Sequence, residues 1–192
     1  MCGIAGSLNF NLPVDKVHQL LYHRGPDEQT AWSENGVQFI HTRLAVQELS
    51  QAGRQPMEMG PLVLMFNGEV YNHLELRQQH QLSCKTNSDT ETLLHLFLKR
   101  GLAALSDLDG MFAISLYNRA ERKLYLIRDR LGEKPLYFRR TSREFIFASE
   151  LKALAKLLQP ELDPQKLSLF LSIGYFPGEF TPYKDIEELL PG

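Results

Sequence analysis

Residues 2–10 read Cys2-Gly3-Ile4-Ala5-Gly6-Ser7-Leu8-Asn9-Phe10 and predict a β-strand rich in small residues, which let another backbone or a ligand come close. Removal of Met1, favoured by the small residue after it, makes Cys2 the first residue. Its α-amine then has an ordinary pKa of about 7.7–8.0 and can act as a base near neutral pH. This strand therefore carries a candidate nucleophile with its own base, although position alone also allows a buried structural cysteine on an edge strand.

Composition narrows the class of protein. The 192 residues are 43% hydrophobic and 23% charged, with a formal net charge of -2 and only two cysteines. That length fits one large domain, or one domain with a short extension. The absence of a basic excess argues against nucleic-acid binding, and no apolar stretch approaches the roughly 20 residues that span a bilayer. We expect a cytoplasmic protein without disulfides and, because the histidines lack paired spacing, without a metal site.

Local patterns predict the order of elements. Asn35-Gly36 between two strand-like runs indicates a hairpin, and Ser88 with Glu91 three residues later is typical of a helix start. The predicted helices cover residues 15–24, 87–100, 151–158 and 164–175, and the predicted strands cover 2–10, 31–34, 37–40, 61–66, 111–117, 123–128, 136–141 and 144–149. Strands joined by short loops pair antiparallel, so we expect an α+β fold with two mainly antiparallel sheets covered by helices.

A family resemblance rests on motifs that span almost the whole chain. Cys2-Gly3-Ile4-Ala5-Gly6 resembles the start of class II glutamine amidotransferases. Seven further segments follow in the family's order: residues 23–27 (HRGPD), 41–46 (HTRLAV), 67–72 (NGEVYN), 88–91 (SDTE), 110–113 (GMFA), 128–137 (RDRLGEKPLY) and 147–154 (FASELKAL). Together they resemble the N-terminal glutaminase domain of glutamine-hydrolysing asparagine synthetases. The resemblance implies the N-terminal nucleophile hydrolase fold, an αββα sandwich of two antiparallel sheets between helical layers.

The resemblance also implies a catalytic set. Cys2 would attack the side-chain amide of glutamine, and the Asn67 amide with the Gly68 backbone N–H would form the oxyanion hole. Removing one such donor typically costs on the order of 10²–10³ in rate. Taken alone, Asn67-Gly68 fits a tight turn better.

Further residues would bind the amino-acid part of the substrate. Arg43 matches the arginine that holds the α-carboxylate, for which a planar fork of donors is suited. Glu69 and Asp89 match the acceptors of the α-ammonium, although an acid in the first turn of a helix is also favourable by itself. Val46 belongs to the same binding segment. Gln47 stands where the family usually has an aliphatic residue, and we expect a small effect because family contacts there are largely through the backbone.

The implied reaction releases glutamate and ammonia from L-glutamine through a Cys2 thioester, with no metal or organic cofactor in this domain. ATP and Mg²⁺ are expected only in a C-terminal synthetase domain, whose Ser-Gly-Gly-x-Asp-Ser loop does not occur in this sequence. We expect residues 1–175 to form the glutaminase domain and residues 176–192 a linker toward that synthetase domain. A different acceptor (a sugar acid or a lactam-forming synthetase), a non-catalytic glutamine-binding module and a homodimer are left open.

Overall fold

Two antiparallel sheets form the centre of the molecule. The computed structural model describes all of residues 1–192. One sheet has the order β10-β8-β9-β1-β3-β2 and the other β4-β5-β6-β7. The strands of the first are β1 (Gly3–Leu8), β2 (Glu28–Glu34), β3 (Val37–Arg43), β8 (Tyr137–Arg140), β9 (Phe145–Ala148) and β10 (Glu187–Glu188). Those of the second are β4 (Met57–Met59), β5 (Leu62–Val70), β6 (Gly110–Asn118) and β7 (Lys123–Arg128).

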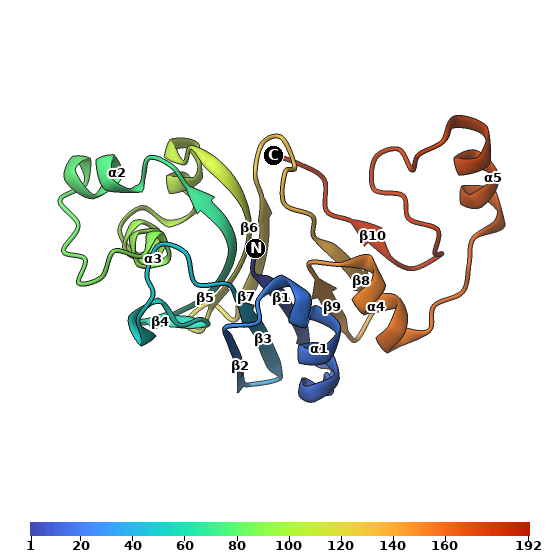
Figure 1. Ribbon diagram of the computed structural model, residues 1–192, viewed down its shortest axis with the longest axis horizontal. Coiled ribbons are helices and arrows are strands. Elements are labelled where there is room, and N and C mark those ends of the chain that lie inside the picture. Colours follow the sequence, from blue (N-terminus) through green and yellow to red (C-terminus); the bar gives the residue numbers. More distant parts are fainter.

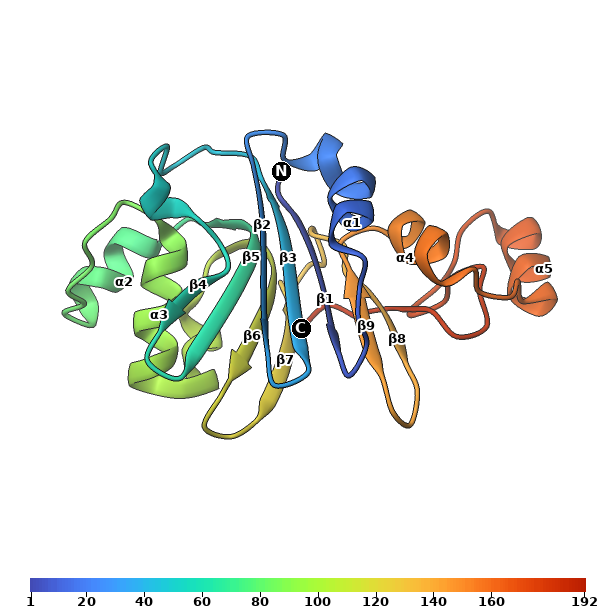
Figure 2. The same cartoon turned by 90° about the horizontal axis from the view of Figure 1, so that it is seen from below.

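Helices cover both outer faces, as Figures 1 and 2 show. α2 (His73–Gln79) and α3 (Asp89–Arg100) lie against the four-stranded sheet, and α1 (Val14–Leu21) and α4 (Leu151–Leu158) lie against the six-stranded one. α5 (Pro164–Ile173) stands apart and has no buried side chain. Short 3-10 helices occupy Tyr22–Arg24, Gln51–Gly53 and Gly101–Asp107. The result is the expected four-layer αββα arrangement.

Three apolar clusters correspond to the three interfaces between layers. The cluster between the sheets includes Ile4, Phe39 and Phe147 from the six-stranded sheet with Val63 and Met65 from β5. Because side chains alternate across a strand, neighbouring residues of β5 such as Leu64 and Phe66 face α3 instead. Burial on both faces explains why residues 61–66 form a continuous apolar run.

The local predictions are largely confirmed. Asn35 and Gly36 have φ angles of 50° and 79°, the two positive values that the tight β2–β3 turn requires. The predicted helix over 15–24 is α1 followed by a 3-10 turn. Ser88 caps α3 by accepting the Thr90 N–H, but the Glu91 carboxylate accepts the N–H groups of Lys85 and Thr86 rather than returning to Ser88.

The segment after residue 175 packs onto the six-stranded sheet. β10 pairs antiparallel with β8, and Ile186 is fully buried. The boundary at 175/176 stays a prediction, but at least part of the segment called a linker is fixed to the domain. None of the helices combines the length and hydropathy that a bilayer crossing requires.

Candidate active site

Cys2 lies just before β1, which pairs with β3 on one side and β9 on the other and is therefore an internal strand. The Cys2 Sγ accepts the Leu44 N–H at 3.4 Å and lies 3.7 Å from the Leu44 carbonyl oxygen. Burial raises the pKa of the thiol, and the Leu44 N–H, the N-terminal charge and the guanidinium of Arg43 partly oppose that rise. A base close to the sulfur is therefore needed to make thiolate near neutral pH.

Arg24 fixes the backbone of Cys2. Its Nε donates to the Cys2 carbonyl oxygen at 2.9 Å, and its Nη1 lies 3.0 Å from the Glu150 carboxylate. His23 also contacts Glu150, at 2.8 Å. The motif of residues 23–27 has no role that the sequence alone predicts. The structure shows that its arginine holds the candidate nucleophile from 22 positions away.

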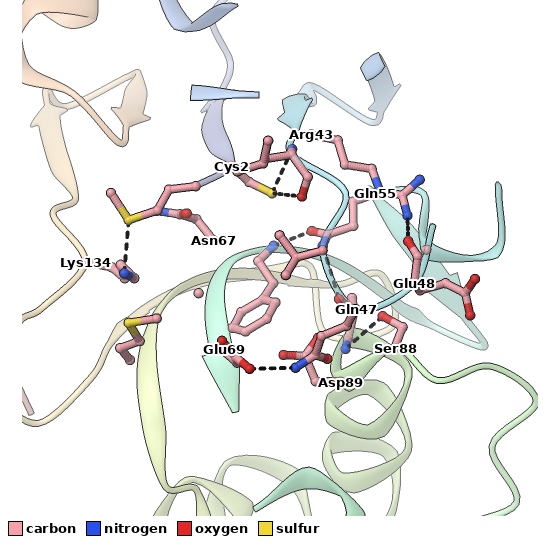
Figure 3. Close-up of a pocket in the computed structure, with 18 residues that line it drawn as sticks. Cys2, Arg43, Gln47, Glu48, Gln55, Asn67, Glu69, Ser88, Asp89 and Lys134 are labelled. Carbon is pink, nitrogen blue, oxygen red and sulfur yellow. Dashed lines mark hydrogen bonds between the residues drawn. The ribbon is translucent and has the colours of Figure 1, made fainter. Parts of the chain in front are cut away.

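A pocket with a volume of about 270 Å³ opens beside the Cys2 thiol. Its wall is built from the start of β1, the end of β3 with the loop after it, the second half of β5, and the start of α3. Every site residue predicted from the sequence lines it: Cys2, Arg43, Val46, Asn67, Gly68, Glu69 and Asp89. Figure 3 shows Cys2 and Asn67 on one side and Glu69 and Asp89 on the other.

Asn67 and Gly68 offer unused donors. Asn67 is fully buried, yet neither atom of its side-chain amide has a hydrogen-bond partner. Phe112, which pairs with Gly68 in the ladder, bonds through both its N–H and its C=O to Asp129, so these two groups point away from β5. The Gly68 N–H therefore points to the opposite edge of β5, because antiparallel pairs alternate between bonded and non-bonded. The unused donors suit an oxyanion hole.

On the edge of β5 that carries the Gly68 N–H, the backbone N–H groups before and after it already have hydrogen-bond partners. The Phe66 N–H donates to Gln55 Oε1 at 2.6 Å, and the Val70 N–H donates to Asp89 Oδ2 at 3.1 Å. β4 covers only the part of this edge that lies before these residues. Side chains thus satisfy the N–H on each side of Gly68 and leave the middle one facing the pocket. Gln55 therefore helps to build the site, although no sequence motif predicts this role.

Arg43 is buried in the pocket wall, and some of its guanidinium N–H groups donate hydrogen bonds to the protein. Nη1 donates to Glu28 Oε2 at 3.2 Å and to the Ser50 carbonyl at 3.0 Å, and Nη2 donates to the Glu48 carbonyl. These bonds occupy three of the five guanidinium N–H groups. The Nε–H and one Nη2–H have no partner, and donors on these two nitrogens can bind a carboxylate. The ion pair with Glu28 gives Arg43 a structural role as well.

The far end of the pocket is acidic. Burial raises the pKa of Asp89 to about 6, against the opposing hydrogen bond from the Val70 N–H. Glu69 accepts a hydrogen bond from Gln47 Nε2 at 3.0 Å. Two carboxyl groups with so little positive charge near them suit a bound ammonium group.

Three other side chains contribute differently from expectation. Val46 lines the pocket while remaining 68% exposed, so its side chain encloses little. Met1 lies in the pocket wall, and its sulfur is 3.0 Å from Nζ of the buried Lys134. Lys134 had no role in the sequence-based set. Removal of Met1 would free this ammonium as well as the α-amine of Cys2.

One group of potential metal ligands lies outside the pocket, where ligand atoms of Cys84, Glu91 and His95 fall within 4.8 Å of one another. The Glu91 carboxylate already accepts hydrogen bonds from the Lys85 and Thr86 backbone. Burial raises the pKa of the Cys84 thiol, which disfavours the thiolate that binds metals. We assign no metal to this group.

The fold defines the class of protein first. Glutamine phosphoribosylpyrophosphate amidotransferase from B. subtilis, solved with ADP and GMP, superposes with a TM-score of 0.66 at 22% identity, over 82% of this chain and 44% of that one. A structure described as the allosteric regulatory enzyme of purine biosynthesis gives a TM-score of 0.63. This chain has the N-terminal nucleophile hydrolase fold of such amidotransferases.

The sequence then defines the family: residues 1–192 match the glutamine amidotransferase domain, and the chain belongs to that family. Its relatives include putative asparagine synthetase [glutamine-hydrolyzing] 2 of Methanocaldococcus jannaschii, 30% identical over 98% of this chain and 42% of that protein. Asparagine synthetase [glutamine-hydrolyzing] 2 of Bacillus subtilis is 37% identical over 80% of this chain and 22% of that protein. Asparagine synthetase B [glutamine-hydrolyzing] of Escherichia coli is 37% identical over 80% and 30%. The chain thus spans less than half of each relative.

Proposed function

We propose that this domain hydrolyses L-glutamine to glutamate and ammonia through a thioester on Cys2. The observation that carries the proposal is the arrangement of the pocket. The Cys2 thiol, the unpartnered Asn67 amide and Gly68 line the same pocket, and two carboxyl groups lie at the end opposite Cys2 and Asn67. A glutamine molecule has its amide at one end and its ammonium at the other. The pocket matches both ends at once.

The reaction follows from this placement. The α-amine of Cys2 takes the thiol proton, and the thiolate attacks the amide carbon of glutamine. Asn67 and Gly68 donate to the oxygen that becomes negatively charged. Collapse of this intermediate breaks the C–N bond, and the protonated α-amine returns its proton to the leaving ammonia. Water then hydrolyses the γ-glutamyl thioester and restores the thiol.

The rest of the substrate binds through charge complementarity. The two unused N–H groups of Arg43 take the α-carboxylate, with Val46 alongside, and Glu69 and Asp89 accept the α-ammonium. These contacts are the same in ground and transition states, so their loss should raise KM more than it lowers kcat.

Removal of Met1 is a condition for this chemistry. With Met1 attached, the nitrogen of Cys2 belongs to a peptide bond and cannot act as a base, and Met1 also occupies part of the pocket wall. The processed domain should therefore be active and the form that retains Met1 inactive.

We further propose that the ammonia serves an asparagine-synthetase-type domain, which would convert aspartate and ATP to asparagine in the longer enzyme. The names and lengths of the relatives support this assignment. The apolar surface of α5 and the residues directly after it supports this too, because Leu171 in α5 is 83% exposed and Tyr175 is 61% exposed. ATP and Mg²⁺ would bind in that other domain. We propose a cytoplasmic location because both cysteines are free thiols. The homodimer stays a prediction, which a measurement of the molar mass in solution by light scattering would test.

The test compares the processed domain with its Cys2→Ala and Cys84→Ala variants. We expect the processed domain and Cys84→Ala to release glutamate and ammonia from glutamine, and Cys2→Ala to release neither. Mass spectrometry of acid-quenched protein should find a γ-glutamyl adduct on the peptide that begins with Cys2. Turnover by Cys2→Ala, or an adduct on another residue, would refute the proposal. N-terminal sequencing establishes that Met1 has been removed.

A further inference from the structure

Gln47 reaches into the acidic end of the pocket, where its Nε2 donates to Glu69 Oε1 at 3.0 Å. A carboxylate only accepts hydrogen bonds, so the nitrogen of this amide must face Glu69 and the oxygen must face away from it. Figure 3 shows Gln47 beside Glu69 and Asp89, away from the thiol. The family usually has an aliphatic residue at this position and makes its contacts there largely through the backbone, so the sequence alone predicts a small effect of Gln47.

The oxygen of this amide is buried and has no partner. Gln47 Oε1 makes no hydrogen bond in the structure, and a buried acceptor left unpaired is destabilising by about 1–3 kcal/mol. Neither neighbouring carboxyl group donates when ionised. A donor that enters the pocket is therefore the group that satisfies this oxygen.

An α-ammonium group supplies what is missing. It carries three N–H donors, and three side chains that line the pocket carry acceptor oxygens: Glu69, Asp89 and Gln47, whose Oε1 is the one without a partner. The hydrogen bond from Gln47 Nε2 also holds one oxygen of Glu69, so Gln47 both orients a carboxylate and adds a neutral acceptor.

We propose that the Gln47 side chain is a specificity-determining residue that recognises the α-ammonium of the amino-acid substrate. The inference rests on glutamine binding in this pocket, as proposed above. It adds a side-chain contact at a position where the family relies on the backbone. A substrate without an α-amino group gains nothing from this contact, and the two kinds of substrate therefore distinguish recognition from general support of the fold.

The variants are Gln47→Met, which keeps the length of the side chain without its polar atoms, and Gln47→Val, which restores the aliphatic residue of the family. Gln51→Met is the matched control, because Gln51 is exposed and does not line the pocket. Each processed protein is assayed by ammonia release from L-glutamine and from glutaramate, which is glutamine without its α-amino group.

We expect both Gln47 variants to raise KM for glutamine by about tenfold or more, the usual effect of losing a hydrogen bond to a charged group, with kcat within about twofold. The kcat/KM for glutaramate and all constants of Gln51→Met should stay unchanged. An unchanged or lowered KM for glutamine in the Gln47 variants would overturn the inference, as would an equal loss for both substrates. Lack of glutamine turnover by the unsubstituted protein would instead contradict the proposed function.

Discussion

At the scale of single residues, Asp89 makes both the stability of the domain and substrate binding in the pocket depend on pH. Burial raises its pKa from 3.8 to about 6, so the folded state binds this proton more tightly than the unfolded chain does. A raised pKa contributes stability that is fully present below pH 4 and lost as the pH rises through about 6. Binding an ammonium group requires the ionised form. Folding and substrate binding therefore favour opposite protonation states of the same carboxyl group.

This conflict predicts the pH dependence of KM. As the pH falls from 7 to 5, KM for glutamine should rise by about tenfold, because the ionised fraction of Asp89 falls by that factor around a pKa of about 6. Asp89→Asn should have a raised KM at pH 7 that changes little over this range. In urea unfolding, Asp89→Asn should gain stability relative to the unsubstituted domain at pH 7 but not at pH 4. The same KM profile in both proteins would contradict the assignment.

Asn67 offers a second prediction at this scale. Its buried amide has no protein partner, so removing it leaves the fold little changed but takes a donor from the oxyanion. Asn67→Ala should lower kcat by on the order of 10²–10³ while KM changes little. Steady-state kinetics with a thermal-unfolding control measures both properties. A kcat within threefold of the unsubstituted domain would remove Asn67 from the oxyanion hole.

At the scale of elements, β5 needs a glycine opposite Phe112. Gly68 has φ = +157°, and a Cβ placed there would lie 2.1 Å from the Met111 carbonyl oxygen and 2.7 Å from Phe112 Cα. Both atoms belong to the backbone of β6 and cannot move without disturbing the ladder. Gly68→Ala should reduce the free energy of unfolding by about 1–3 kcal/mol or more, as overpacking does, and abolish turnover.

A substitution at a second glycine tests whether the steric clash with β6 or the positive φ angle explains the effect at Gly68. Gly178 has φ = +60° with no atom within 4 Å of the added Cβ, so Gly178→Ala should cost only about 1 kcal/mol and retain activity. Urea denaturation of both variants measures the difference. Equal destabilisation by the two substitutions would show that φ, rather than the contact with β6, explains Gly68.

The elements predicted from the sequence are those with a local cause. The Asn35-Gly36 turn, the Ser88 cap and the period of the helix after it all lie within a few residues of what they specify. α2 and the two-residue β10 were not identified, and β10 exists only because it meets β8 about 50 positions earlier in the chain.

The residues of the site also divide into those that could be predicted from the sequence and those that could not. Motif resemblance identified the pocket residues from Cys2 to Asp89. The supporting contacts of Arg24, Gln55 and Gln47 were missed because they join side chains to distant backbone or to each other, which no local pattern encodes.

At the scale of the whole molecule, four segments meet at one end of the sandwich to form the pocket. Antiparallel pairing sets the start of β1 beside the end of β3, with Gly3 opposite Thr42. Asp89 Oδ2 joins the start of α3 to Val70 at the end of β5. The nucleophile comes from one sheet and the oxyanion donors from the other, so catalysis depends on how the two sheets are held together.

Arg128, at the end of β7, joins the four-stranded sheet to the last residues of the chain. Its Nε donates to the Lys134 carbonyl at 2.8 Å, its Nη2 to the Gly132 carbonyl at 2.6 Å, and its Nη1 lies 2.8 Å from Glu188 of β10. Lysine keeps the charge but cannot make this planar fork of bonds. Arg128→Lys should therefore lower the free energy of unfolding by about 2–3 kcal/mol, roughly 1 kcal/mol for each hydrogen bond lost.

Arg139→Lys is the matched control for Arg128→Lys. The guanidinium of Arg139 lies 3.6 Å from Glu144 and 3.7 Å from Asp185, too far for strong bonds. Partly exposed pairs contribute about 0–1 kcal/mol, so this variant should unfold almost like the unsubstituted domain. Arg128→Lys should also raise KM for glutamine, because Lys134 lies in the pocket wall. If both variants lose the same stability in urea, the bonds of Arg128 do not join the C-terminal strand to the active site as we predict.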